Sequence, residues 1–251
     1  MIVWTVVLGG LALAGPSDSV EVRPVESVAW AQLNPARGDA SPRAADLWGS
    51  RTDDVPTGFL VRFVDGFSSP PHIHNVSYRA IVLSGEVHNA HPSAEPMWMA
   101  PGSFWTQPHG QSHITSARGE TMAYVEVDSG PYLVRPVDQA VDSTEKPINV
   151  DVSNLVWLST PTPDTRVAYL WGAPEEGPGG VFLRTTPAKA LAADGRGGSL
   201  RAVVVAGTMQ AAGHPALGPG SLVSGPSVDL TCAGDQPCVV YVRGDQGVRP
   251  R

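Results

Sequence analysis

The sequence has little of the basic charge that nucleic-acid-binding proteins need. Only Lys146 and Lys189 are lysines, the arginines stand singly, and the formal net charge of the 251 residues is −7. Because binding to a phosphate backbone requires clustered basic side chains, we exclude nucleic acid as a partner. Long apolar stretches are also missing beyond residues 1–14. No run of 18 apolar residues occurs there, so we expect no stable membrane span in the mature form.

The composition excludes disorder and a helical bundle. Hydrophobic residues make up 42% of the chain and charged residues 16%, a balance too apolar for an intrinsically disordered protein. The 27 glycines and 24 prolines favour many short strands joined by tight turns over long helices. We therefore expect a folded, strand-rich protein.

Two features bear on the compartment of the protein. Residues 1–14 carry no charged side chain and finish in Ala-Leu-Ala, the small-x-small form of a signal-peptidase site. They predict a signal peptide and export to the periplasm or the exterior; the alternative is a cytoplasmic protein with a misassigned start or a buried first strand. The only two cysteines, Cys232 and Cys238, flank a turn-like segment and are either disulfide-bonded or free thiols.

An internal repeat organises most of the chain. The segments that match are 47–49 with 170–172, 79–85 with 201–207, and 101–103 with 219–221. The separation along the chain between the matching segments is four residues shorter for the last pair than for the second pair. A longer connection in the first copy, residues 88–97, accounts for the difference. We predict that this connection is a loop.

Each copy consists of short runs of Val, Leu, Phe and Tyr, such as residues 59–63 and 122–127, separated by Gly, Pro, Asn and Asp. This pattern is typical of antiparallel strands, and it predicts an all-β protein of two tandem jelly-roll barrels. The predicted division is an N-terminal arm packing across both barrels (15–42), a first barrel (43–136), a linker (137–150) and a second barrel (151–251).

Three histidines of the first copy form a candidate metal site. In an extended strand, residues two apart point to the same face, so His72 and His74 aim into one cavity. A Pro-x-Gly turn at residues 108–110 precedes His113 and can carry it back to face that pair. Three neutral imidazoles with open positions suit a divalent transition metal, Zn or Fe foremost, with Ni, Mn, Cu or Co also compatible.

These motifs resemble those of the cupins, the RmlC-like jelly-roll superfamily. The first cupin motif has a glycine, five residues, His-x-His and a closing glycine, and its spacing holds from Gly66 to Gly85. The second has a glycine, five residues, Pro-x-Gly, two residues and a histidine, and its spacing holds from Gly102 to His113. With the repeat, the resemblance extends over most of the chain and implies a bicupin.

Two positions depart from the common cupin pattern. Tyr78 stands where many cupins have a glutamate ligand, and Ala117 stands where the second motif often ends in asparagine. The chain is therefore similar to the ChrR-like three-histidine cupins, which include the zinc module of an anti-sigma factor and a diketone-cleaving oxygenase. Within that group it looks like an uncharacterised branch, a domain of unknown function, so the resemblance implies a fold and ligands but no reaction.

The second copy carries none of the three histidines. The repeat aligns His72 and His74 with Asp194 and Arg196, and His113 with Thr231. Scaffold elements recur in both copies whereas the imidazoles occur only in the first. We expect metal binding in the first barrel and a degenerate, structural second barrel.

Further residues have both a functional and a structural interpretation. Tyr78 is the candidate catalytic residue, as a ligand or proton donor, and is equally explained as a packed aromatic. Arg79 could bind an anionic substrate, but its counterpart Arg201 favours a structural salt bridge. Gln107 could orient a bound water or belong to the turn. Trp98, Phe104 and Trp105 could wall a pocket or fill the core. Glu86 and Glu126 are the acidic candidates for a catalytic role. The other histidines, His88, His91, His109 and His214, are predicted on the surface.

The leading hypothesis is a metal-binding bicupin with one divalent transition metal in a small-molecule pocket, acting as a dioxygenase or a hydrolase. The alternative is a non-catalytic zinc-binding sensor or small-ligand-binding module. Both leave the small-molecule ligand unidentified. The resemblance to cupins, which often pair through sheet edges, implies a homodimer.

Overall fold

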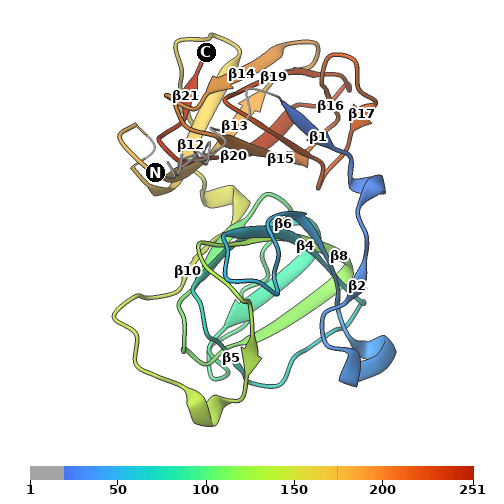
Figure 1. Cartoon of the computed structure of the whole chain (residues 1–251), viewed down its shortest axis with the longest axis vertical. Helices are drawn as coiled ribbons and strands as arrows, with labels where there is room; N and C mark the ends of the chain where they lie inside the picture. The colour runs from blue at the N-terminus through green and yellow to red at the C-terminus, as the bar shows by residue number, and fades with distance from the viewer. Residues whose placement is uncertain (1–19, 174) are drawn as a thin grey trace, which may run out of the picture.

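The computed structural model describes residues 20–173 and 175–251, and the expected signal peptide at 1–14 lies outside them. Strands dominate this part of the chain, and the all-β prediction is confirmed. Its helical segments are four short 3-10 turns, namely η1 (Val25–Ser27), η2 (Pro35–Ala40), η3 (Val137–Gln139) and η4 (Val152–Asn154). Two jelly-roll barrels lie one above the other along the longest axis of the molecule (Figure 1). In the described residues, no helix has the length and apolarity needed to cross a membrane.

The first barrel is a seven-stranded antiparallel sheet in the order β10-β7-β6-β8-β4-β3-β2, completed by the strand pair β5-β9. The bounds are β2 (Ala31–Gln32), β3 (Arg43–Trp48), β4 (Thr57–Phe63), β5 (Ile73–His74), β6 (Tyr78–Ala90), β7 (Phe104–Gln107), β8 (Ile114–Val127), β9 (Val134–Arg135) and β10 (Ile148–Val150).

The long strands β6 and β8 pair along most of their length, with a register shift on either side of Ser84. Gly85, the closing glycine of the first histidine motif, lies in this irregular stretch with φ 65°. A Cβ atom there would stand 2.2 Å from Oγ1 of Thr121 in β8, so only glycine allows the two strands to approach here. The motif glycine therefore has a structural role in shaping the barrel.

The second barrel has a seven-stranded sheet, β1-β18-β15-β20-β13-β12-β11, and a five-stranded sheet, β17-β16-β19-β14-β21. The bounds are β1 (Glu21–Arg23), β11 (Leu158–Ser159), β12 (Thr165–Gly172), β13 (Gly179–Thr185), β14 (Ala190–Asp194), β15 (Leu200–Ala206), β16 (Met209–Gln210), β17 (Ala216–Leu217), β18 (Leu222–Gly225), β19 (Ser227–Cys232), β20 (Cys238–Gly244) and β21 (Arg249–Pro250). Cys232 and Cys238 form a disulfide between β19 and β20, which decides between the two interpretations of these cysteines.

The connecting segments are more tightly integrated than the sequence predicts. The arm contributes β1 to the second barrel, where it pairs with β18, and β2 to the first, where it pairs with β3. The segment 137–150, predicted as a linker, ends in β10, which pairs with β7 and belongs to the first barrel's sheet. The first barrel therefore extends to Val150.

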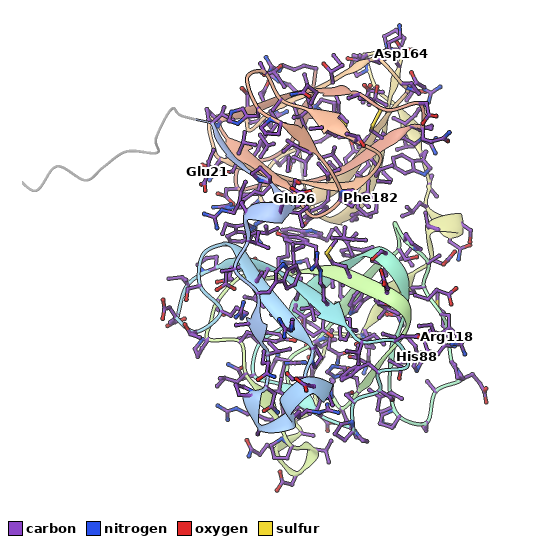
Figure 2. The ribbon with its side chains drawn as sticks, turned by 90° about the vertical axis from the view of Figure 1, so that its right-hand side faces the viewer. Glu21, Glu26, His88, Arg118, Asp164 and Phe182 are labelled. Atoms are coloured by element: carbon purple, nitrogen blue, oxygen red, sulfur yellow. A yellow bond between two sulfur atoms is a disulfide. The ribbon has the colours of Figure 1, made fainter. Side chains whose placement is uncertain are left out.

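The predicted loop 88–97 and the surface position of His88 need correction. Strand β6 continues to Ala90, so the loop is shorter than the repeat comparison indicated. The His88 side chain is 3% exposed and packs near Trp98, with ring centroids 5.9 Å apart, while the guanidinium of Arg118 lies 3.6 Å from the centroid of the Trp98 ring. Figure 2 shows His88 and Arg118 side by side on the first barrel. His88 is thus a packed core residue.

The two barrels share a hydrophobic core at their junction. This cluster combines fully buried side chains of the first barrel, such as Leu60 and Ile81, with Phe182 and Val203 of the second. Phe182 lies on the face of the second barrel that meets the first (Figure 2). Because each barrel also has its own interior cluster, the junction adds a third apolar core that holds the two together.

Candidate metal centre

The fold brings the three candidate histidines together, as their spacing predicts. His74 ends β5, His72 precedes it, and His113 precedes β8. The backbones of His72 and His113 exchange two hydrogen bonds of 3.0 Å, which fixes these residues opposite each other. Their ring centroids are 4.2 Å apart, and the ring of His74 lies 5.0 Å from His72 and 5.1 Å from His113.

Backbone carbonyls fix the tautomer of all three rings. In each ring Nδ1 contacts a carbonyl oxygen: His72 with Pro70 at 3.0 Å, His74 with Leu133 at 3.2 Å, and His113 with Gln111 at 3.2 Å. Since a carbonyl oxygen only accepts, each Nδ1 carries the proton and donates it. Each Nε2 is thereby left unprotonated, with a lone pair that can coordinate a metal, the arrangement that metal-binding histidines usually have.

The geometry of the cluster fits one cation. One nitrogen from each ring can be chosen so that all three lie within 4.8 Å of one another. A cation with metal–nitrogen distances of about 2.1 Å holds ligands up to about 4.2 Å apart, so small ring rotations complete the site. Nε2 of His113 is buried, and no described residue offers it a hydrogen bond. A buried acceptor without a partner is costly unless something else binds it.

The environment also keeps the rings neutral. Burial lowers the pKa of all three, most clearly for His74 and His113, whose side chains are 2% and 1% exposed. For His113, burial followed by the neighbouring charge on His72 lowers the pKa to about 3. The neutral imidazole is the form that donates its lone pair to a metal.

Tyr132 is a site residue that the sequence analysis missed. Its ring stacks on His74 with centroids 4.5 Å apart, and its hydroxyl lies 3.2 Å from Nε2 of His74. Asn75 fixes the backbone around it, donating to the carbonyl of Pro131 at 2.9 Å and accepting from the amide of Leu133 at 2.8 Å. Asn75 therefore positions both Tyr132 and the carbonyl that orients His74.

The structure gives Tyr78 a packing role instead of the ligand role. The centroid of its ring lies 5.2 Å from that of His74. Its hydroxyl, however, donates a hydrogen bond of 3.1 Å to Oδ1 of Asn89 and accepts one of 3.4 Å from Nε1 of Trp105. Burial raises the pKa of Tyr78, so the phenol stays protonated. Because the Tyr78 hydroxyl donates its proton to the buried side-chain amide of Asn89, Tyr78 is neither a phenolate ligand nor a donor available to a ligand.

Gln107 belongs to the same buried network. It accepts from the amide of Asn89 at 3.0 Å and donates to the carbonyl of Gln111 at 3.2 Å. That carbonyl is the one that orients His113. Gln107 is therefore a supporting residue behind the cluster and does not line the cavity.

The other residues singled out in the sequence lie in four places, namely the cavity, the junction of the barrels, the surroundings of Arg118 and the exposed surface. Trp105 lines the cavity, whereas Phe104 belongs to the junction core and Trp98 packs against Arg118. Glu86 is paired in register with Arg118, outside the cavity. Glu126 and Arg79 lie at the junction of the barrels, where they contact Tyr241 and Trp171 of the second barrel. His91, His109 and His214 are exposed, as predicted.

A cavity of about 420 Å³ opens over the cluster and is lined by His72 and His74. Its walls are mainly apolar, with Val61, Phe63, Phe67, Trp105 and Val125 from the barrel. The N-terminal arm covers one side with Leu33, Asn34, Arg37 and Pro42. No sequence motif indicates this contribution, because the arm lies outside the internal repeat.

Comparisons with known proteins agree with the cupin fold. The model of a family described as "Domain of unknown function (DUF4437)" matches residues 21–249. No curated protein matches the chain. A solved structure from Nostoc punctiforme, described as a "putative dioxygenase", is similar at 14% identity and a TM-score of 0.70, covering 94% of this chain and 87% of that one.

Oxalate decarboxylase of Bacillus subtilis is also similar. A structure of a single-residue mutant of that enzyme matches at 11% identity and a TM-score of 0.60, covering 95% of this chain and 80% of that one. Another structure of the enzyme, described by its Mn(II) centres, has a TM-score of 0.58 at 11% identity over the same shares. At these identities the similarity shows the fold alone.

Proposed function

Because the chain belongs to the family described as a domain of unknown function, DUF4437, we propose its function from the site itself. In this proposal the first barrel binds one divalent transition metal through His72, His74 and His113, and acts as a small-molecule dioxygenase. The observation that carries the metal site is the buried Nε2 of His113, which finds no partner in the described residues although Nδ1 of the same ring is satisfied.

The chemistry of the cavity favours oxygenation over hydrolysis. Hydrolysis at a metal-bound water normally uses a nearby general base, yet the described residues lining the cavity include no Asp or Glu. A bound Fe(II) ion would supply reactivity towards O2, which needs no such base from the protein. The proposal is also supported by the resemblance in fold to the protein described as a "putative dioxygenase".

The residues of this chain supply positioning and exclusion of water. The apolar walls exclude water from the cavity, and the carbonyl that contacts each Nδ1 leaves the three Nε2 atoms unprotonated for a metal. The Tyr132 hydroxyl, beside Nε2 of His74, is placed to donate a hydrogen bond to an oxygen of a bound substrate.

The second barrel completes a bicupin in this proposal and serves as its scaffold. Asp194, the counterpart of His72, pairs with Arg249 at 2.6 Å, so an ion pair stands where the first barrel has an imidazole. We group the chain with the three-histidine, ChrR-like cupins because Tyr78 replaces the glutamate ligand. We also propose that the protein is exported. The Cys232–Cys238 disulfide supports this proposal because disulfides persist in oxidising compartments.

Oxygen uptake tests the activity. Wild type and His74→Ala, each reconstituted anaerobically with Fe(II), are mixed with O2 and a set of β-diketones, thiols and sugars. We expect uptake with one class of compound in wild type and loss of it in His74→Ala, with exposed His109→Ala as the matched control. Stoichiometric metal binding without uptake for any compound would contradict the enzyme proposal and leave a zinc-binding sensor.

A further inference from the structure

Arg37, at the rim of the cavity, is a positively charged side chain without an ion-pair partner among the described residues. It lies in η2 of the N-terminal arm and lines the same cavity as His72 and His74. Its guanidinium is 5.1 Å from the centroid of the Phe67 ring. Among the residues that the structure describes, no carboxylate lies within ion-pairing distance of it. In a half-buried arginine that forms no ion pair with a carboxylate, the N–H groups of the guanidinium are available to donate hydrogen bonds to a ligand.

The hydroxyl groups of Ser69 and Thr115 in the cavity wall already form hydrogen bonds within the protein. Oγ of Ser69 contacts Nδ1 of His72 at 3.2 Å and accepts from the backbone amide of Thr115 at 2.9 Å. The hydroxyl of Thr115 donates to Asn89 at 2.8 Å. No Asp, Glu or Lys occurs among the described lining residues. Apart from the histidine cluster and Tyr132, Arg37 is therefore the strongest group available to bind a ligand.

The arm holds Arg37 in place rather than leaving it free in solvent. The backbone amide of Leu33 donates to the carbonyl of Pro42 at 2.8 Å, and the amide of Asn34 donates to Oγ of Ser41 at 2.8 Å. Gln32 donates to the carbonyl of Gly38 at 2.9 Å and closes the turn. This bracing orders the segment before a ligand arrives, which reduces the entropy lost on binding.

We propose that Arg37 determines substrate specificity by binding the carboxylate of a ligand whose apolar body lies along Phe63, Phe67 and Val125 towards the histidines. The substrate class is then a monocarboxylate with an alkyl or aryl chain. This proposal rests on the proposed function for the reaction, but the binding of the carboxylate by Arg37 does not depend on the metal. It also sets an orientation, with the carboxylate at the rim and the apolar end at the cluster.

Octanoate and octan-1-ol, which share an alkyl chain and differ in charge, test this proposal. Their affinities are measured by calorimetry at neutral pH with Zn-loaded wild type, Arg37→Gln, Arg37→Lys and Arg166→Gln, the last an exposed arginine of the second barrel. We expect wild type to bind octanoate roughly tenfold or more tightly than octanol, the factor typical of hydrogen bonds to a charged group. Arg37→Gln should lose this preference, Arg37→Lys should keep part of it, and Arg166→Gln should keep all of it.

The same titrations on metal-free His74→Ala separate this proposal from the metal site. Persistence of the octanoate preference in His74→Ala, together with its loss in Arg37→Gln, supports the rim site whether or not the metal proposal holds. Equal affinity for octanoate and octanol in wild type, or a preference that survives Arg37→Gln and disappears in His74→Ala, overturns it, because the carboxylate would then bind at the histidine cluster.

Discussion

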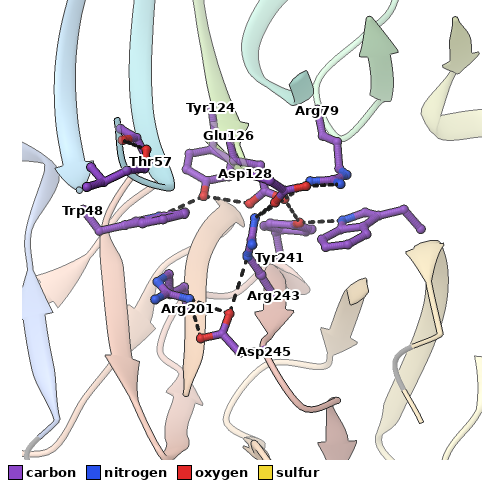
Figure 3. Close-up of polar contacts among 12 residues, drawn as sticks. Trp48, Thr57, Arg79, Tyr124, Glu126, Asp128, Arg201, Tyr241, Arg243 and Asp245 are labelled. Carbon is purple, nitrogen blue, oxygen red and sulfur yellow. Dashed lines mark hydrogen bonds and ion pairs between the residues drawn. The ribbon is translucent and has the colours of Figure 1, made fainter. Parts of the chain in front are cut away.

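Tyr241 of the second barrel donates a hydrogen bond of 2.7 Å to the carboxylate of Glu126 in the first barrel. The other oxygen of Glu126 accepts from Tyr124 of its own barrel at 3.0 Å. Each tyrosine hydroxyl also accepts a hydrogen bond from an indole N–H. Trp48 donates to Tyr124, and Trp171 donates to Tyr241. Figure 3 shows this arrangement between the barrels. The repeat therefore reappears in space as two matching Trp–Tyr pairs that converge on one buried carboxylate.

The charge of Glu126 is balanced from both barrels. Arg79 of the first barrel and Arg243 of the second lie 3.7 and 3.6 Å from the same oxygen. Arg79 also stacks over Trp171 across the junction, at 3.7 Å. The salt-bridge role expected for Arg79 is thus present, and Glu126 is a structural residue away from the cavity.

Replacement of Glu126 by glutamine should destabilise the protein strongly. The side chain is 1% exposed, and without its charge the buried Arg243 and the half-buried Arg79 have less compensation for their own charges. Breaking a buried ion pair costs about 3 to 5 kcal/mol, and we expect a loss of this size in urea unfolding. Asp229→Asn, which removes an exposed partner of Arg251, is the matched control and should cost about 0.5 kcal/mol or less. Equal effects of the two variants would contradict this role for Glu126.

Asp128 should make the stability of the protein sensitive to acid. Burial raises the pKa of Asp128, but the hydrogen bond and charge of Arg79 and the charge of Arg243 outweigh burial and hold that pKa below its usual value. A carboxyl with a depressed pKa contributes stability that is present above the unfolded pKa and lost as the pH falls through the folded value.

The unfolding free energies of wild type and Asp128→Asn should therefore differ by a constant amount above about pH 5 and converge as the pH falls below that value. Urea unfolding at a series of pH values measures the difference. A gap that widens on acidification would have the wrong sign for this assignment.

Asn75 should matter for metal affinity although it does not reach the cluster. Asn75→Ala releases the backbone of Pro131 and Leu133, and with it the carbonyl that orients His74. Loss of such supporting contacts typically weakens metal binding tenfold to a hundredfold, so we expect roughly a tenfold fall in Zn affinity in a chelator competition assay. Exposed Asn154→Ala should leave the affinity unchanged. A wild-type affinity in Asn75→Ala would show that the carbonyl contact does not tune the site.

Tyr132→Phe should bind zinc slightly more tightly than wild type. The Tyr132 hydroxyl contacts Nε2 of His74, and coordination of a metal by this nitrogen has to break the contact. A hydrogen bond contributes about 1 kcal/mol net, so its removal should raise the affinity about fivefold in the same competition assay. A fall of tenfold or more would identify Tyr132 as a ligand instead of a competitor.

The sequence predicted the parts of the site that depend on local periodicity. Strand alternation is enough to align His72 with His74, and the turn before His113 is enough to return it to them. The repeat likewise identified two barrels and the absence of imidazoles from the second. These inferences need no knowledge of contacts between distant segments.

The remaining site residues depend on tertiary contacts that no spacing encodes. Tyr132 meets His74 across 58 residues, and Arg37 reaches the cavity because the arm folds back over the barrel. Tyr78 was placed correctly beside the cluster, but only the structure shows its hydroxyl turned to Asn89. His88 was expected on the surface in a loop over residues 88–97, whereas β6 continues to Ala90 and His88 is buried.

Zinc titration of purified, metal-stripped protein tests the central claim most directly. Wild type and the control His109→Ala should each bind one equivalent of zinc per chain, whereas His113→Ala should lose this binding by more than about a hundredfold, because it removes one of the only three protein ligands of the proposed site. Circular dichroism of the variants confirms that the barrels are folded. Wild type that binds no zinc, or His113→Ala that binds one equivalent with wild-type affinity, would contradict the account.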